Sequence, residues 1–165
     1  MDVGQINHER FKNHLRQSTK DVFLVAHHLH RQGYGVYIPP FKVASSLSQI
    51  GDNQDKGDLF FEHNGKRLIV EVKTTNTSDF TDVRPHRFST FFVCAVHAFE
   101  KYKGQPPSYY FIVNKSRTYV GVINVKETFS SWEVIETEDR RYIGYKQKRY
   151  ACPTNLVTIQ KIIHE

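Results

Sequence analysis

Asp58, Glu71 and Lys73 lie in a stretch, Lys56–Thr75, that is otherwise rich in aromatic and β-branched residues. The dipeptide Asn64-Gly65 divides this stretch into two runs. Asn-Gly is the strongest short-range signal for a two-residue type I′ turn, because both central positions need a positive φ angle. The sequence therefore predicts a β-hairpin whose two strands carry the three charged residues.

The register of this hairpin decides which side chains meet. With a two-residue loop, His63 faces Lys66, and Asp58 lies directly opposite Glu71. Facing residues of an antiparallel pair share one face of the sheet, with Cβ atoms about 4.5–5.5 Å apart. Lys73 follows Glu71 by two residues and points to the same face. We therefore expect the two carboxylates to lie side by side with an amine next to them.

Two carboxylates held side by side repel each other, and folding alone gives no reason to place them so. A divalent cation between them removes the repulsion and takes both as oxygen ligands. A lysine beside such a site can orient or activate a water molecule and offset charge that builds on a phosphate. The alternative is a solvated hairpin face with an ordinary Glu–Lys pair, which is the more common explanation of Glu71-Val72-Lys73 taken alone.

The pattern resembles the PD-(D/E)xK nuclease superfamily, in which an acid on one strand is followed by Glu-x-Lys on the next. It falls here on Asp58 and Glu71-Val72-Lys73, with Gly57 where the superfamily usually has proline. The resemblance implies an α/β fold with a restriction-endonuclease-like core, a mixed central β-sheet flanked by helices. It also implies a Mg²⁺-dependent phosphodiesterase that cleaves DNA as an endonuclease and accepts Mn²⁺. Asp58, Glu71 and the Val72 carbonyl would hold the metal, and Lys73 would position or deprotonate the attacking water.

A long first helix, from about His8 to Gln32, is predicted from apolar residues at helical spacing. Many members of the resembled superfamily add an acid from this helix to the metal site. The segment Asp21–Pro39 is similar to the first helix and strand of Holliday-junction resolvases. Asp21 is therefore predicted to be the helix acid, with Glu9 as the second choice. An ordinary surface carboxylate is the alternative.

Other candidate metal ligands have less support. Asp52 and Asp55 lie in a polar loop, 41–57, where a carboxylate is usually only solvated. His27 and His28 are adjacent and point to different sides of a helix, so they cannot chelate one ion together. No Cys/His spacing typical of a structural zinc site accompanies them.

The chain is predicted to be a single nuclease domain, 1–165, with a core of about 8–125 and a C-terminal extension of about 126–165. The path from the hairpin through a second helix to the next strand suggests a crossover and parallel pairing. Outside the hairpin and the first helix, the predicted elements are a strand Gly35–Ile38, a helix Pro85–Lys103, strands Tyr109–Asn114, Tyr119–Val125 and Trp132–Thr137, a basic hairpin or loop pair around 140–150, and a short helix Leu156–Ile163.

The net charge of +6 favours a polyanionic partner, and we expect this to be DNA. Hydroxyl and basic side chains that follow the hairpin, and a basic and aromatic run near the C-terminus, could contact phosphates. Turn chemistry and a charge-protected edge strand are the respective alternatives. The candidate nucleic-acid-binding residues are Thr74, Thr75, Arg84, His86, Arg87, Arg140, Arg141, Lys146, Lys148 and Arg149.

A hydrophobic content of 39% and an aromatic content of 13% are typical of a folded domain and exclude a disordered chain. The sequence has no apolar run of membrane-spanning length and no signal peptide, and its two cysteines are too few for a disulfide framework. We therefore expect a cytoplasmic protein without a membrane partner.

Because no separate recognition module is evident, a homodimer is possible, and both structure-selective and restriction-like cleavage stay open. The other function classes are a non-catalytic nucleic-acid-binding module of the same fold and an RNA endonuclease of the same superfamily.

Overall fold

The structure is a computed structural model, and it describes residues 3–40, 57–102, 104–138 and 144–164, except for the side chains of residues 15–17. The candidates Asp52, Asp55, Arg140 and Arg141 lie outside the described residues. Within the described ranges the helices are α1 (Val3–Arg31), α2 (Val96–Glu100) and α3 (Val125–Thr128), with 3₁₀ turns η3 (Phe129–Ser131) and η4 (Thr154–Leu156). The strands are β1 (Gly35–Tyr37), β2 (Leu59–His63), β3 (Lys66–Thr74), β4 (Thr90–Ala95), β5 (Tyr109–Val113), β6 (Tyr119–Asn124), β7 (Glu133–Glu138), β8 (Lys146–Pro153) and β9 (Thr158–Lys161).

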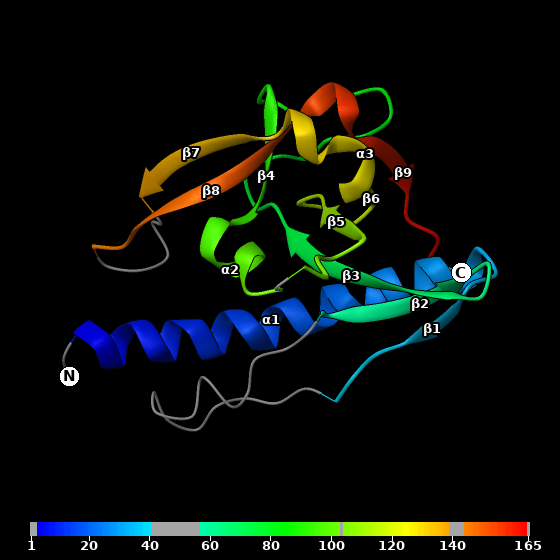
Figure 1. Ribbon diagram of the computed structural model, residues 1–165, viewed down its shortest axis with the longest axis horizontal. Helices are drawn as coiled ribbons and strands as arrows, with labels where there is room; N and C mark the ends of the chain where they lie inside the picture. Colours follow the sequence, from blue (N-terminus) through cyan, green and yellow to red (C-terminus); the bar gives the residue numbers. More distant parts are fainter. Residues whose placement is uncertain (1–2, 41–56, 103, 139–143, 165) are drawn as a thin grey trace.

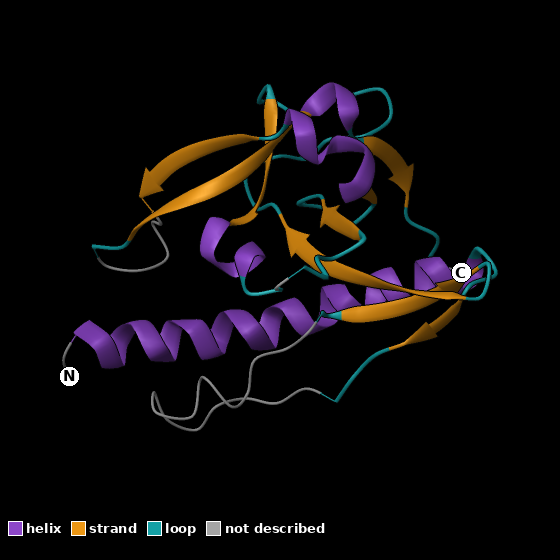
Figure 2. Cartoon of the chain, in the orientation of Figure 1, coloured by secondary structure: helices purple, strands orange, loops and turns teal. Residues whose placement is uncertain are grey.

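The main sheet has the strand order β1-β2-β3-β5-β6-β9 (Figures 1 and 2). β3 and β5 are parallel, whereas β1–β2, β2–β3, β5–β6 and β6–β9 are antiparallel. The fold is therefore α/β with a mixed central sheet and flanking helices, as the sequence predicted. The predicted parallel crossover is also present, although its connection contains a strand and a short helix instead of one long helix.

The predicted hairpin is confirmed, and its register is confirmed from Leu59 to His63, whereas the predicted pairing of Asp58 with Glu71 is not part of the β2–β3 ladder. β2 and β3 pair from Leu59↔Val70 to His63↔Lys66, and the turn residues Asn64 and Gly65 have φ angles of 52° and 72°. Both angles are positive, as a type I′ turn requires. The local chemistry of two residues therefore sets the register of the paired strands β2 and β3.

α1 covers one face of the main sheet and forms the first hydrophobic core (Figure 1). Val22, Val25 and Leu29 of the helix pack with apolar residues that β2, β3, β5 and β6 turn toward it. Along β3, Val70 and Val72 point into this core, so Glu71 and Lys73 point to the opposite face. The apolar stripe predicted for the first helix is thus its buried face.

The opposite face is covered over β5 and β6 by a smaller sheet of order β4-β8-β7, and β7 and β8 form an arm that projects from the body (Figure 1). The predicted helix Pro85–Lys103 is wrong: its centre is the strand β4, and only Val96–Glu100 is helical. Phe91 and Val93 are buried while Phe92 is 49% exposed, which is the alternation of a strand. β4 pairs with β8, and a long-range partner of this kind is not visible in the local pattern.

The C-terminal helix predicted for Leu156–Ile163 is also wrong, because this segment holds the strand β9. β9 pairs with β6 and forms an edge of the main sheet. The predicted strand Trp132–Thr137 is confirmed by β7. Residues after Val125 thus supply β9 to the main sheet and β7 and β8 to the smaller one.

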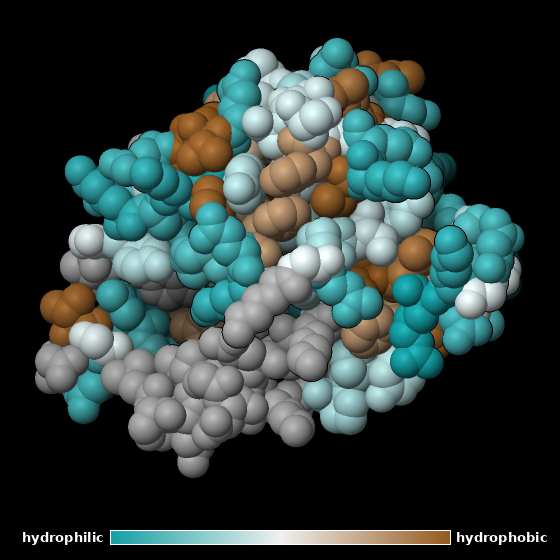
Figure 3. Space-filling model, in the orientation of Figure 1, coloured by the Kyte–Doolittle hydropathy of each residue, from teal (hydrophilic) through white to brown (hydrophobic). Residues whose placement is uncertain are grey.

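Apolar residues on the face drawn in Figure 3 form separate patches among hydrophilic ones. No helix in the described part of the chain is long and apolar enough to cross a membrane.

Candidate active site

The hairpin brings the predicted acids and the lysine together at the start of β2. The Asp58 N–H donates to the Val70 carbonyl at 3.0 Å, although Val70 is the partner of Leu59, so the regular β2–β3 register ends at Leu59 and does not pair Asp58 with Glu71. The Val72 N–H donates to Asp58 Oδ2 at 2.7 Å. The carboxylate of Asp58 is therefore fixed against β3, next to Glu71.

Gly57 explains why this chain departs from the proline of the resembled pattern. Its φ angle is 129°, which a proline ring cannot adopt and which other L-residues rarely adopt. A Cβ atom at this position would lie 2.6 Å from Cγ2 of Ile69. The glycine is therefore a requirement of the backbone that delivers Asp58 to the site.

Both carboxylate oxygens of Glu71 accept hydrogen bonds. Lys73 Nζ donates to Oε2 at 3.0 Å, and the hydroxyl of Tyr102 donates to Oε1. The Glu71 side chain is 14% exposed and the Lys73 side chain 43% exposed. The site therefore consists of a largely buried acid with an amine at the solvent boundary.

The electrostatics keep Lys73 charged. Burial lowers the pKa of the ammonium group, but attraction by Glu71 and Asp58 outweighs this effect, so the net pKa of Lys73 lies above its ordinary value. Both carboxylates therefore lie close enough to Lys73 to act on its charge. Lys73 is thus a hydrogen-bond donor in this arrangement.

Tyr102 is a further site residue that the sequence does not single out, because it lies in the segment Pro85–Lys103 that is predicted to be a helix. It follows α2, and burial together with the negative charges of Glu71 and Asp58 raises the pKa of its hydroxyl, which stays a donor. Cys94 and Tyr110 form a side-chain hydrogen bond nearby, and burial raises the pKa of the Cys94 thiol to about 11. Tyr110 is paired with Glu71 across β3 and β5, whereas Cys94 belongs to β4 and Tyr102 follows α2, so these groups meet only through long-range contacts.

The residues present fit a hard divalent cation. Mg²⁺ is usually held by one or two carboxylates, with waters and substrate phosphates as its other ligands. Asp58 and Glu71 supply two carboxylates. No group of three or more His, Cys, Asp or Glu side chains suited to a metal occurs in the described ranges. Zinc takes three or four protein ligands, and Mg²⁺ or Mn²⁺ at this site stays a prediction.

The carbonyl of Val72 has the orientation that the prediction needs. In a strand the N–H and C=O of one residue point to the same edge, and the N–H of Val72 points to Asp58. β2 begins at Leu59, opposite Val70, so this carbonyl lies beyond the paired part of β2. Its role as a metal ligand stays a prediction.

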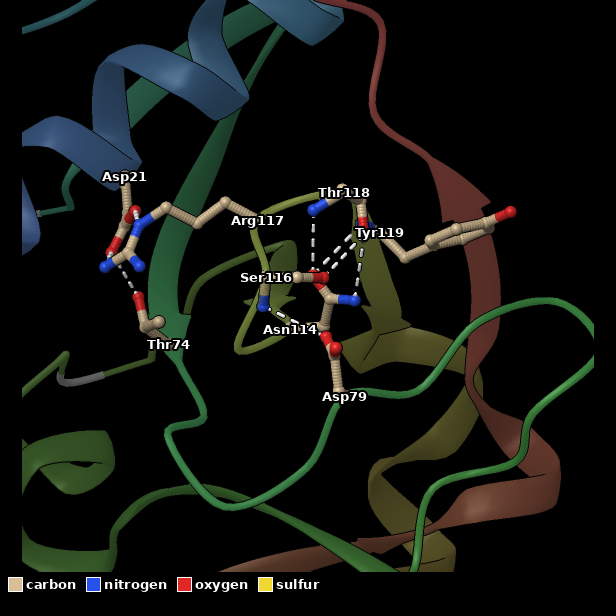
Figure 4. Close-up of polar contacts among 8 residues, drawn as sticks. All are labelled: Asp21, Thr74, Asp79, Asn114, Ser116, Arg117, Thr118 and Tyr119. Atoms are coloured by element: carbon tan, nitrogen blue, oxygen red, sulfur yellow. Dashed lines mark hydrogen bonds and ion pairs between the residues drawn. The ribbon is translucent and has the colours of Figure 1, made fainter.

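Asp21, the predicted helix acid, is placed differently (Figure 4). Its side chain is 3% exposed and accepts hydrogen bonds from Nε of Arg117 at 2.7 Å and from the Thr74 hydroxyl at 2.6 Å. Thr74 is in phase with Val72 on the α1 face of β3, opposite Glu71. The contacts of Asp21 therefore do not support a place in the metal site. The second choice, Glu9, forms an ion pair with Lys12 on α1.

Asn114 holds the turn that carries Arg117 through hydrogen bonds to its backbone (Figure 4). Asn114 is buried, and its Oδ1 accepts the backbone N–H groups of Thr118 at 2.9 Å and Tyr119 at 3.1 Å. Arg117 itself has a φ of 60°. The turn thereby presents the guanidinium group to Asp21 and links α1 to the β5–β6 turn.

The candidate DNA contacts near the hairpin already have structural partners. The hydroxyl of Thr75 lies 3.2 Å from that of Thr77, and His86 stacks on Phe91 with ring centroids 3.8 Å apart. Arg87 lies over the Phe88 ring, at 4.9 Å. Arg84 is exposed. Of the residues in this loop, the arginines keep their charged ends at the surface.

The basic strand β8 lies against acidic residues. Lys146 is opposite Glu138 and Lys148 is opposite Glu136, on β7. Arg149 lies over the Phe92 ring, at 5.6 Å. Cross-strand pairs of opposite charge stabilise an antiparallel ladder. This arrangement favours the alternative in which the charges serve the arm itself, and a role of these residues in DNA binding stays a prediction.

No protein-family model and no curated protein matches the chain. Among solved structures, the chain is similar to a bacterial homing endonuclease, I-Ssp6803I, with 16% identity and a TM-score of 0.35. The similarity covers 81% of this chain and 67% of that one. The function proposed below therefore rests on the geometry of Asp58, Glu71 and Lys73.

Proposed function

We propose that the protein is a Mg²⁺-dependent phosphodiesterase that cleaves DNA as an endonuclease. The observation that carries this proposal is the cluster of Asp58, Glu71 and Lys73 at the start of β2. The cluster has the residue types and the sequence order of the PD-(D/E)xK pattern, with Asp58 directly before β2 and with Glu71 and Lys73 on β3. A pair of carboxylates with a lysine alongside has no evident role in packing.

In this proposal Asp58 and Glu71 hold the metal ion, and the carbonyl of Val72 adds a neutral oxygen ligand. When bound, the ion supplies a lowered pKa for water and a positive charge near the phosphate. Lys73 donates hydrogen bonds that orient the attacking water and stabilise the negative charge of the phosphorane-like transition state. Tyr102 holds the carboxylate of Glu71 in place.

The net charge of +6 supports a nucleic-acid substrate. A non-catalytic binding module would have no use for the complete set of two acids and a lysine. An RNA substrate is the second candidate, because the same site would serve it, and a cleavage assay separates the two. Whether one chain or a homodimer cleaves can be read from light scattering of the active species.

The experiment compares wild type with Lys73→Ala on supercoiled, linear, single-stranded and branched DNA and on RNA, with and without Mg²⁺. Removal of a group that stabilises the transition-state charge is expected to lower the rate by about 10²–10³-fold. Lys66→Ala, which removes an exposed lysine at the hairpin turn, is the matched control and should retain wild-type activity. Equal activity of wild type and Lys73→Ala, or cleavage without a divalent ion, would overturn the proposal.

A further inference from the structure

An aromatic stack lies beside the candidate active site on the same face of the main sheet. Tyr37 of the edge strand β1 is paired with Phe60 of β2, and their rings stack at 6.1 Å with an interplanar angle of 30°. The guanidinium carbon of Arg67 lies over the Phe60 ring, at 6.0 Å. Tyr37, Phe60 and Arg67, from three neighbouring strands, form a unit that we call the stacking platform.

The position of the platform follows from strand alternation. Phe60 pairs with Ile69 of β3, which precedes Glu71 by two residues, so Phe60 lies on the face of Glu71, at a spacing of about 7 Å along the strand. Stacked nucleotides are spaced about 3.4 Å apart along one strand of DNA. The platform therefore lies about two stacked nucleotides from the carboxylate cluster.

The core does not account for the platform. Val36 and Phe61, the neighbours of Tyr37 and Phe60 in sequence, point to the other face and pack with α1. Tyr37 is 52% exposed. Its ring therefore offers a free apolar surface to solvent next to an exposed arginine.

We propose that the platform binds the bases of an unpaired nucleic-acid strand that flanks the scissile phosphate. Every base has a π face that stacks on an aromatic ring regardless of sequence, and an arginine adds cation–π and phosphate contacts. Bases inside a duplex are stacked on both sides, so only an unpaired base offers a face to Tyr37. This inference rests on the proposed nuclease function and narrows its substrate to single-stranded DNA or to duplexes with an unpaired segment.

Binding without cleavage tests the platform. The affinity of a fluorescein-labelled single-stranded oligonucleotide, and of a blunt duplex of the same sequence, is measured by anisotropy in EDTA at one fixed salt concentration. Tyr37→Ala is expected to weaken single-strand binding by about 5- to 150-fold, the equivalent of about 1–3 kcal/mol for one stacked base. Duplex binding should change less than twofold, because it depends on phosphate contacts.

Two variants serve as controls. Tyr37→Phe keeps the ring and should bind the single strand within twofold of wild type. Phe23→Ala removes an aromatic side chain of similar exposure, 55%, from α1 on the other side of the sheet and should also bind normally. Thermal unfolding of each variant shows whether the fold is intact.

Wild-type affinity of Tyr37→Ala for the single strand, or an equal loss on single strand and duplex, would overturn the inference. A second measurement is independent of folding defects: an oligonucleotide with 5-iododeoxyuridine should crosslink to Tyr37 or Phe60, and crosslinks only at other residues would contradict the platform. Lys73-dependent cleavage with unchanged Tyr37→Ala binding would refute the platform and leave the nuclease intact. If Tyr37→Ala weakens single-strand binding but the wild type cleaves no substrate, the nuclease proposal is refuted and the platform stands.

Discussion

At the scale of single residues, the site depends on how Glu71 is held. Its two oxygens accept hydrogen bonds from Lys73 and from Tyr102. A carboxylate that is fixed in this way loses little side-chain entropy when it binds a cation. Outer hydrogen bonds of this kind orient metal ligands, and their loss usually lowers metal affinity or activity by about 10–100-fold.

Tyr102→Phe tests this role, because it removes only the hydroxyl that Glu71 accepts. Mn²⁺ affinity, measured by isothermal titration calorimetry, is expected to fall by about 10–100-fold. Turnover at saturating Mn²⁺ should recover toward wild type, since the ligands are still present. Tyr37→Phe is the control, because it removes a tyrosine hydroxyl away from Glu71. Unchanged Mn²⁺ affinity of Tyr102→Phe would show that Glu71 is positioned without this bond.

At the scale of elements, the hairpin was predictable because its signal is local. Asn64 and Gly65 fix the turn, and the turn fixes which side chains face each other. β4 was not predictable in the same way, because Phe88, Phe91, Phe92 and Phe99 fit helical spacing as well as a strand. Its pairing with β8 decided the outcome, and Tyr102 was missed for the same reason. The role of Asp21 depended on Arg117, a residue 96 positions away.

Gly57→Ala is predicted to disturb the site through the hairpin backbone. Alanine would be strained at a φ of 129°, and its Cβ would meet Ile69. Backbone strain of this kind costs about 1–3 kcal/mol, which chemical denaturation can measure. Relief of the strain would move Asp58, so activity should fall more than stability does. Gly35→Ala, where a Cβ would meet nothing within 4 Å, is the control. Wild-type activity of Gly57→Ala would mean that this backbone conformation is not needed.

The ion pair of Asp21 and Arg117, which links α1 to the β5–β6 turn, predicts that the two alanine variants lose different amounts of stability. Arg117→Ala leaves the buried carboxylate of Asp21 without its cation, and this should cost about 3 kcal/mol of unfolding free energy. Asp21→Ala should cost less, because the Arg117 side chain is 47% exposed and can be hydrated. Urea unfolding of both variants measures the difference. The reverse order of the two losses would contradict the account of this pair.

A variant of Asp21 also distinguishes a structural role of this residue from a role in metal binding. Asp21→Asn should bind Mn²⁺ as wild type does, since Asp21 contacts Thr74 and Arg117 on the other face of β3. A Mn²⁺ affinity reduced tenfold or more would instead support the role that the sequence pattern first suggested for this acid.

At the scale of the whole molecule, the net charge says less about where a nucleic acid would bind than the positions of the charged residues do. The net charge of +6 is real, yet Lys146 and Lys148 of β8 face Glu138 and Glu136. Within the described residues, the surface near the site that the smaller sheet leaves open to a nucleic acid is the half of the main sheet formed by β1, β2 and β3. Composition indicated the kind of partner, and only the three-dimensional arrangement indicates where that partner would bind.

The central claim is that Asp58 and Glu71 together hold a hard divalent cation. Crystals soaked in Mn²⁺ and measured at the manganese absorption edge test it directly. The account predicts an anomalous peak between the two carboxylates in wild type and its loss in Glu71→Gln. No peak at this position, or a peak that persists in Glu71→Gln, would contradict it.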